Sequence, residues 1–538
     1  MTLRRASFAG ALLALGTATV TMFAQAPSAD WPMFGQGATN NASSNQGPTT
    51  ANVANLQVAW TFTTGGDVSA RAAVVDGVAY FPDWGGNLWA VNAKTGALIW
   101  GTQLSSYGLA AGTVSRTSPA VANGVVYIGT QYVAPAAGST VQPPTGWLLA
   151  IDAASGNLLW KIQPDTSNPF PVITGSPAVV NGVVYVGMTS NEEFAAAAGS
   201  QYYACCSVRG SIVAVSVAAY SPHVLWQTFT VPVGYSGGAV WGSTPVVDLH
   251  RETVFVGTGN NYSVPTAPAY NACIKAGGTE AACLSPGDHA DSIIALNMNT
   301  GHIKWATRLM TWGQYGINDG SDSWNVDCIF AAPGTQNCPA SSGPDYDFGS
   351  GPNEITYTAN GSKVTIIGAG QKSGIYYALN PDTGYELWHT QVGPGSSLGG
   401  MEWGSATDGA NIYVAISNLY GIPYAAGSAG SFAALNPATG SIVWQVADPN
   451  GAVDLGPMTV SNGVVYAASM GGAPTAPTML ALNASTGSTL WSFAPGSSVN
   501  AGATIAEGMI FWGSGYAHLG IPGYTGNNQF FAFAVPQP

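Results

Sequence analysis

The sequence predicts an all-β protein, an eight-bladed β-propeller. Three features predict it: a hairpin phrase that ends in tryptophan and recurs along the chain, a second apolar phrase that precedes each hairpin, and an incomplete half-hairpin near each end. Two hairpins per repeat give four strands, which is the content of one propeller blade. We therefore expect one large domain at residues 27–538, although length alone would suggest several.

The hairpin phrase is clearest at Met479–Trp491. Its first half alternates like a half-buried strand, Asn483 to Gly487 has the chemistry of a turn, and apolar residues resume up to Trp491. The same phrase recurs at Leu88–Trp100, Leu148–Trp160, Ile293–Trp305, Tyr376–Trp388 and Phe432–Trp444, with a degenerate copy at Ile212–Trp226.

The two half-hairpins predict how the ring closes. Phe530–Val535 is an eighth first half without a tryptophan, and Leu56–Trp60 is an eighth second half with nothing before it. The preceding phrase, as in Ser118-Pro-Ala-Val-Ala-Asn-Gly-Val-Val-Tyr, also occurs eight times. Because an open array would leave exposed strand edges, we expect the N-terminal strand to complete the last blade.

Composition excludes some classes of partner. Charged residues are 7% of the chain and the formal net charge is −13, with only 13 Lys plus Arg. Nucleic-acid binding depends on cationic contacts to phosphates, so we expect no nucleic-acid partner. Residues 1–26 resemble a secretory signal, with Arg4 and Arg5 before an apolar run and Ala24-Gln25-Ala26 as a cleavage site. No later apolar stretch predicts a membrane span, so we expect a soluble periplasmic or secreted protein.

Six cysteines in an exported chain predict disulfides. Cys273 and Cys283 are ten residues apart, as are Cys328 and Cys338, and local pairing is the simplest interpretation. The adjacent Cys205 and Cys206 would then form a disulfide with each other. No Cys-x-x-Cys-His occurs, so no covalent c-type haem is expected.

The hairpin phrase Ala-Leu-Asn-x-x-Thr-Gly-x-x-x-Trp resembles the tryptophan-docking motif of quinoprotein alcohol dehydrogenases. That family consists of eight-bladed propellers that hold pyrroloquinoline quinone (PQQ) and a calcium ion on the axis. The opening Asp30-Trp-Pro-Met-Phe-Gly-Gln and the adjacent cysteines look most like its polyvinyl alcohol dehydrogenase branch. The resemblance spans the chain from about Ala29. A non-enzymatic scaffold of the outer-membrane assembly machinery carries the same repeat and is the alternative.

The resemblance implies a set of cofactor-binding residues, several of them in the long third to fifth blades. Arg116 corresponds to the family's cation, and Thr174 and Thr189 to its two hydroxyls. Cys205 and Cys206 correspond to the vicinal disulfide over one face of the quinone, Trp241 to the tryptophan beneath the other face, and Lys372 to the lysine at the quinone oxygens. Trp241 does not close a blade, so docking does not explain it. The cysteine pair lies one blade later than in the methanol-oxidising branch.

The resemblance also implies calcium ligands and a catalytic base. The metal ligands would be Glu192, Asn260 and Asp322, with Glu193 as an open alternative to Glu192. Asp322-Ser-Trp-Asn matches the motif whose first aspartate is the base. The Tyr-Asp that should follow is displaced by the Cys328–Cys338 loop to Asp345-Tyr-Asp, so Asp345 rivals Asp322.

These residues together imply oxidation of an alcohol, small or polymeric, by hydride transfer to PQQ. Calcium and Lys372 would stabilise negative charge on the quinone oxygens, while Asp322 would take the hydroxyl proton. Because the chain shows no haem motif, the resemblance implies an external soluble cytochrome c as electron acceptor.

Overall fold

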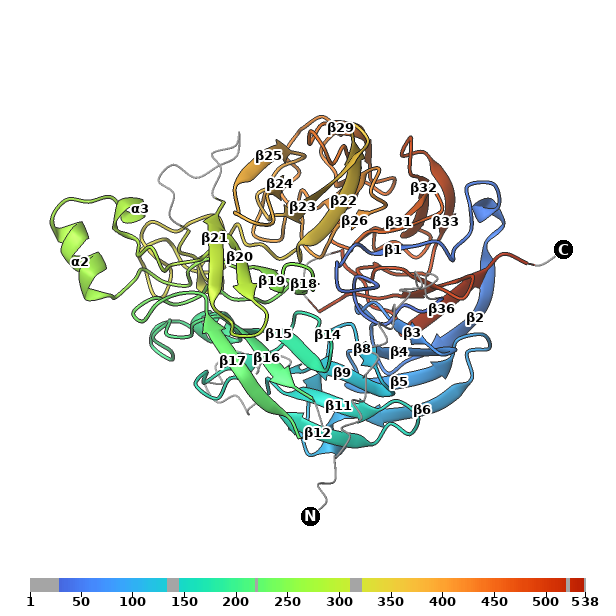
Figure 1. The fold of residues 1–538 in the computed structure, drawn as a ribbon, viewed down its shortest axis with the longest axis horizontal. Coiled ribbons are helices and arrows are strands. Elements are labelled where there is room, and N and C mark those ends of the chain that lie inside the picture. The colour runs from blue at the N-terminus through green and yellow to red at the C-terminus, as the bar shows by residue number, and fades with distance from the viewer. Residues whose placement is uncertain (1–28, 133–144, 218–220, 310–321, 519–522, 537–538) are drawn as a thin grey trace, which may run out of the picture.

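A computed structural model describes residues 29–132, 145–217, 221–309, 322–518 and 523–536. Eight blades, each with four antiparallel strands, follow one another around a ring, as the colour gradient of Figure 1 shows. The predicted eight-bladed propeller is confirmed. The predicted signal segment, residues 1–26, lies outside the described residues.

The strands of each blade run from the channel outward. In chain order the first four blades are β3 (Ala73–Val75), β4 (Val78–Pro82), β5 (Asn87–Asn92) and β6 (Leu98–Gln103); β8 (Ala120–Ala122), β9 (Val125–Gly129), β11 (Leu148–Asp152) and β12 (Leu158–Ile162); β14 (Ala178–Val180), β15 (Val183–Ser190), β16 (Ser211–Ser216) and β17 (His223–Phe229); and β18 (Val246–Asp248), β19 (Thr253–Gly257), β20 (Ser292–Asn297) and β21 (Ile303–Arg308).

The second half of the ring repeats this order. Its blades are β22 (Asn353–Ala359), β23 (Ser362–Gly370), β24 (Ile375–Leu379) and β25 (Glu386–Gln391); β26 (Ala406–Thr407), β27 (Ile412–Ile416), β28 (Ser431–Leu435) and β29 (Ile442–Ala447); β30 (Thr459–Ser461), β31 (Val464–Ala468), β32 (Met479–Asn483) and β33 (Thr489–Phe493); and β34 (Thr504–Ala506), β35 (Met509–Gly513), β36 (Gln529–Ala534) and β2 (Gln57–Thr63).

The ring closes as predicted, through the eighth blade. Strand β2 pairs antiparallel with β36, with Phe62 opposite Phe530, and the two strands lie side by side in Figure 1. The first and last parts of the chain therefore share one sheet. This pairing covers the edge that β36 would otherwise expose.

Tryptophan docking explains the repeated Thr-Gly-x-x-x-Trp phrase. In six blades the indole N–H of the closing tryptophan donates to a backbone carbonyl in the next hairpin turn, for example Trp444 to Ala484 O at 2.9 Å. The indole N–H of Trp491 donates instead to Leu56 O, just before β2, at 3.1 Å. The ring also packs on the turn glycine. Gly487 has φ +74°, and a Cβ there would lie 2.6 Å from the Trp444 ring. Glycine therefore provides both the left-handed turn and the space for the indole.

An N-terminal segment, Ala29–Ser44, crosses the channel and touches every blade; we call it the plug. Met33 packs into the apolar core shared by the second and third blades. Backbone hydrogen bonds tie the plug to the other six blades, at Val74, Val247, Glu354, Thr407, Val460 and Glu507, and also to Val121 of the second. The part that is β1 (Ser43–Ser44) pairs parallel with β30. The plug thus closes the channel at the level of the inner strands.

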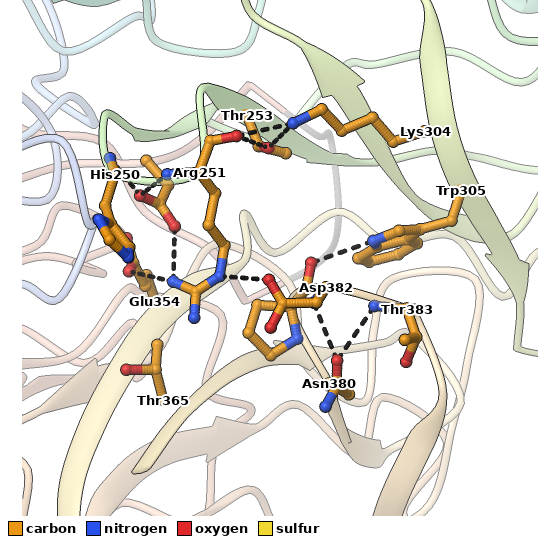
Figure 2. Close-up of polar contacts among 12 residues, drawn as sticks. His250, Arg251, Thr253, Lys304, Trp305, Glu354, Thr365, Asn380, Asp382 and Thr383 are labelled. Atoms are coloured by element: carbon orange, nitrogen blue, oxygen red, sulfur yellow. Dashed lines mark hydrogen bonds and ion pairs between the residues drawn. The ribbon is translucent and has the colours of Figure 1, made fainter. Parts of the chain in front are cut away.

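An ion-pair network joins the fourth blade to the fifth (Figure 2). Arg251, in the turn between β18 and β19, donates to Asp248 at 2.8 Å and to Asp382 at 2.8 Å, and lies 3.6 Å from Glu354. The same view shows Trp305 donating to Pro381 O at 3.0 Å. Burial and the neighbouring Asp248 raise the pKa of Glu354 to about 7, against the opposing effect of Arg251.

The long loops of the third to fifth blades leave the opposite face from the tryptophan turns. They contain α1 (Glu192–Ala196), η4 (Val326–Ile329), and a lobe of α2 (Pro268–Lys275) and α3 (Glu280–Cys283) that projects at the left of Figure 1. The disulfides are Cys205–Cys206, Cys273–Cys283 and Cys328–Cys338, so the predicted pairing is confirmed. Among the described segments, no helix is long and apolar enough to cross a membrane.

Candidate functional site

The sequence-predicted site residues converge at the mouth of the channel. Arg116, Thr174 and Trp241 lie just before the inner strands of their blades, whereas Lys372 lies in the short turn between β23 and β24. Arg116 and Thr174 also line a small central cavity. It is lined by Phe34, Ser69, Ala70, Arg71, Arg116, Ser118, Thr174, Ser176, Gly242, Trp403, Pro457, Asn500 and Tyr516.

Trp241 is the fixed centre of the site. Its indole N–H donates to Asp347 Oδ2 at 2.7 Å, and Trp403 packs edge-on against it with ring centroids 5.3 Å apart. Two cations flank the same ring: Lys372 Nζ is 5.0 Å and Arg116 Cζ 5.9 Å from its centroid. An aromatic plane with two cations close to it suits a flat anionic ligand.

Lys372 is buried and bound by two carboxylates. Its Nζ lies 3.0 Å from Asp345 Oδ2 and 3.2 Å from Asp347 Oδ2. Burial alone would lower the pKa of Lys372, but these two carboxylates raise it well above its usual value. The lysine therefore stays charged and can donate to an anionic oxygen.

Asp322 and Asp345 are in direct contact, which the sequence left open. The Asp322 carboxylate accepts the backbone N–H of Asp345 at 3.0 Å and of Tyr346 at 2.7 Å. Burial raises the pKa of Asp322 to about 7, although these two hydrogen bonds oppose the rise. Burial likewise raises the pKa of Asp345 well above its usual value, against Lys372. A carboxylate with a pKa near 7 is suited to accept a proton at neutral pH.

Asn260 presents an oxygen with no protein partner. Its backbone N–H donates to Asp347 Oδ1 at 2.6 Å, and its Nδ2 donates to Trp324 O at 2.9 Å. These contacts fix the amide so that Oδ1 points elsewhere, fully buried and without a hydrogen bond from any described residue. A buried acceptor left unmatched is costly, and a cation would satisfy it.

The two neighbouring glutamates have different environments. The carboxylate of Glu192 accepts from Tyr203 OH at 2.5 Å, from the Ser207 backbone N–H at 2.6 Å and from the Val208 N–H at 2.9 Å. It is buried and anchors the loop that follows the adjacent cysteines. Its oxygens are thus engaged with protein donors, unlike those of a metal ligand that is free to bind.

Glu193 instead faces the acidic cluster. Burial, then Asp347, raises its pKa to about 8, with Lys372 opposing and Glu192 and Asp322 adding to the rise. Within the described chain its carboxylate has no side-chain hydrogen bond. Carboxylates crowded in this way favour either a proton or a cation between them.

The remaining predicted residues lie around this centre. Thr174 donates its hydroxyl to Trp241 O at 2.6 Å, and the hydroxyl of Thr189 is 3.5 Å from that of Tyr262. The Cys205–Cys206 loop is held by Asn337, whose side-chain oxygen accepts the Cys205 N–H at 3.0 Å. The Cys328–Cys338 insertion therefore supports the vicinal disulfide.

Sequence reasoning missed three residues of the site: Asp347, Glu402 and Trp403. Asp347 joins Trp241, Asn260 and Lys372. Trp403, like Trp241, does not close a blade, and this signal could have found it. Burial raises the pKa of the adjacent Glu402 to about 7, with Lys372 opposing, and its Oε2 has no hydrogen bond to any described residue.

The residues present fit a calcium ion in part. Carboxylate and amide oxygens are the ligands calcium prefers, and Glu193, Asp322 and the unmatched Asn260 Oδ1 are of that kind. Across the described residues, no three His, Cys, Asp or Glu side chains are grouped closely enough to hold a metal alone. A cation here would need further oxygens, from a bound ligand or water.

The chain is similar in sequence and in fold to known proteins. A family model described as outer membrane protein assembly factor BamB matches residues 49–307 and 428–519. Polyvinylalcohol dehydrogenase of Pseudomonas sp is 32% identical over 530 residues, covering 90% of this chain and 73% of that protein. Its namesake from Sphingopyxis sp. (strain 113P3) is 29% identical over 511 residues, covering 87% and 69%. Quinohemoprotein alcohol dehydrogenase of Comamonas testosteroni superposes with a TM-score of 0.65 at 19% identity, over 95% of this chain and 82% of that one, and shows the fold.

Proposed function

Because the chain belongs to the polyvinyl alcohol dehydrogenase family of PQQ-repeat propellers, we propose that it oxidises secondary alcohols to ketones with PQQ as acceptor. The observation that carries this proposal is Trp241, an aromatic plane fixed by Asp347 and flanked by Lys372 and Arg116. PQQ is a flat, acidic ortho-quinone, and its ring and charges match this arrangement.

Residues around Trp241 would each have a role in binding PQQ or in the reaction. Lys372 would donate to the quinone oxygens, Arg116 would bind a carboxylate, and Cys205–Cys206 would cover the face opposite Trp241. The hydroxyls of Thr174 and Thr189 would add hydrogen bonds. When bound, PQQ supplies a two-electron acceptor for the hydride from the alcohol carbon. Asp322 would take the hydroxyl proton, so that alcohol becomes ketone.

We propose calcium as the metal, with Asn260 and Asp322 as ligands. Of the two glutamates, Glu193 is favoured over Glu192, because the latter's oxygens already accept three short hydrogen bonds from protein donors. Asp345 remains a rival to Asp322 as the base, but its Oδ2 is engaged by Lys372 at 3.0 Å. Among the described residues, Asp322 accepts hydrogen bonds from backbone N–H groups alone and is therefore the better proton acceptor.

The rim of the mouth suits an extended substrate with apolar stretches. Phe194 in α1 and Ile329 and Phe330 at η4 are largely exposed, and α1 packs against η4. Tyr202 adds a further exposed ring in the same loop as α1. Such side chains would bind the hydrocarbon backbone of a polymeric alcohol such as polyvinyl alcohol.

The cellular setting is proposed from the sequence. Residues 1–26 would direct export, and three disulfides suit the oxidising periplasm or exterior. An external soluble cytochrome c would take the electrons one at a time.

The decisive experiment is reconstitution of the apo protein. We expect PQQ with calcium to give an absorbing complex and dye-linked oxidation of secondary alcohols, with EGTA preventing both. Comparing a small secondary alcohol with polyvinyl alcohol, in wild type and Phe330→Ser, would test the rim; the substitution should slow only the polymer. If PQQ does not bind under any metal condition, a scaffold function replaces the enzymatic one.

A further inference from the structure

Two buried arginines line the central cavity. Arg71 and Arg116 both contribute to its wall, and among its described lining residues there is no Asp or Glu. The whole chain has 13 Lys plus Arg against 26 Asp plus Glu. Two of these few cations thus line one cavity, and none of its described lining residues is a carboxylate.

Arg71 is held in place but not neutralised. Its guanidinium donates to Phe34 O at 2.6 Å, Met458 O at 2.9 Å and Thr459 Oγ1 at 2.9 Å, and lies over the Phe34 ring. These partners carry no net charge. Its Nε is buried and bonds to no described residue, and burial lowers the pKa of Arg71 to about 9.

Arg116 is only partly compensated. Its guanidinium lies 4.7 Å from the Trp403 ring centroid, its Nε is also buried without a partner among the described residues, and burial lowers its pKa. Tyr516 is its hydrogen-bonded neighbour. The acid whose charge acts on it, Glu402, has a pKa raised to about 7 and is therefore partly neutral at that pH.

Buried cations without anions are costly, because desolvation is not repaid by an opposite charge. A carboxylate placed in the cavity would supply the opposite charge that both guanidinium groups lack, and Ser118 and Ser176 line the same space. Asn500 Oδ1 is buried there too, without a partner in the described chain. Because Asn500 Oδ1 accepts from neither arginine, the Nε–H donors of Arg71 and Arg116 stay available.

We propose that Arg71 is a second carboxylate-binding arginine, which together with Arg116 binds a carboxylate group of PQQ inside the central cavity. This inference rests on the proposed function. Because Phe34 of the plug lines the cavity and binds Arg71, the plug forms part of the ligand's pocket. The cavity is then a binding pocket for the acidic end of the cofactor.

The test introduces a carboxylate that belongs to the protein. Asn500→Asp keeps the shape of the side chain but places a negative charge in the cavity that the two arginines line. Asn299→Asp makes the same change in an exposed turn and is the matched control. We expect the apo form of N500D to melt at a higher temperature than wild type and to bind PQQ at least ~10-fold more weakly, measured by quenching of tryptophan fluorescence. The control should change neither.

Arg71→Lys provides a second variant that keeps the charge and the plug but removes the guanidinium fork. It should weaken PQQ binding ~10-fold or more. Because the guanidinium also donates to Phe34 O, Met458 O and Thr459 Oγ1, the apo variant should melt at a lower temperature, so PQQ binding is measured well below that temperature. Unchanged PQQ affinity in both N500D and R71K, with normal binding by wild type, would overturn the inference and leave the proposed function standing. Failure of wild type to bind PQQ would instead overturn the proposed function.

A small free anion is the alternative occupant of the cavity, and a further titration distinguishes it from a carboxylate of PQQ. Apo wild type and N500D are melted in increasing inorganic phosphate and in malonate. If phosphate or malonate stabilises wild type but not N500D, while both bind PQQ equally, the cavity holds a free anion and the inference is wrong. Competition of malonate with PQQ in wild type, lost in N500D, would support it.

Discussion

Replacing each of the two adjacent glutamates by glutamine should give opposite results. Glu193→Gln removes a carboxylate crowded by others, whereas Glu192→Gln turns an acceptor of three short hydrogen bonds into an amide whose NH₂ faces a donor. We expect apo E193Q to be more stable than apo wild type at pH 7, and E192Q to be less stable. Calcium should stabilise wild type and E192Q but not E193Q.

The size of the effect follows from the pKa of Glu193, which is raised from 4.5 to about 8. An acid with a raised folded pKa contributes stability while protonated, and this stability is lost as pH rises from 4.5 towards 8. Each pH unit corresponds to about 1.4 kcal/mol. At pH 7 the upper limit is therefore ~3 kcal/mol, and sharing of the charge with Asp322 and Asp347 reduces it to roughly 1–3 kcal/mol.

The opposite effect in E192Q has another cause. Burying a donor without an acceptor costs ~1–3 kcal/mol, and the loss of a charge-assisted bond adds to it. Calcium at one hundred times its dissociation constant should stabilise wild type by ~2.7 kcal/mol. The assay is chemical denaturation at pH 7 with calcium or EGTA, together with calcium titration calorimetry. Calcium stabilisation that survives in E193Q and disappears in E192Q would refute the assignment.

Three further results are expected. Asp322→Asn should lower turnover by ~10²–10⁴-fold with PQQ still bound, and the same loss in Asp345→Asn but not in D322N would identify the other carboxylate as the base. Desolvation and a neighbouring aspartate raise the pKa of buried Asp454, so the free energy of unfolding should fall as pH rises above 3.8. Asp454→Asn should make that fall shallower in melting curves from pH 4 to 8, and parallel curves for the two proteins would contradict this prediction. Gly487→Ala should lower the free energy of unfolding in urea by ~2–4 kcal/mol more than Gly361→Ala does. Both glycines have positive φ, but only a Cβ at position 487 would clash with an indole. Equal losses would argue against docking as the role of the turn glycine.

The fold was predictable because its main contacts are local and repeated. A tryptophan and the glycine of the next hairpin turn recur in register, so even an isolated copy such as Phe432–Trp444 carries the pattern. The plug was not predictable. Its hydrogen bonds go to single backbone groups on many different strands, and such contacts leave no periodic signal in Ala29–Ser44.

The site was predictable in residue type but not in every position. Glu192 and Glu193 begin a short helix, where successive side chains point about 100° apart, so one enters the loop behind the cysteines and the other the acidic cluster. Spacing along the chain cannot choose between them. Asp322 and Asp345 are separated by the Cys328–Cys338 insertion, yet the backbone after it folds back to donate to Asp322. Arg71 is a lone cation in an apolar repeat, and its place with Arg116 in the wall of one cavity appears only in the folded chain.

The charges around Trp241 are arranged asymmetrically, and this has a consequence for orientation. Glu193, Asp322 and Asp347 gather with Lys372 towards the long loops, whereas Arg71 and Arg116 line a cavity whose described lining residues include no Asp or Glu. A cation is attracted to the first group and a carboxylate to the second. On the proposed function, a flat ligand with a metal-binding edge and acidic groups elsewhere would therefore bind in one direction on the indole. Reversal would bring its acidic groups against protein carboxylates and leave the arginines unpaired, so the protein's electrostatics select the edge presented to Asp322.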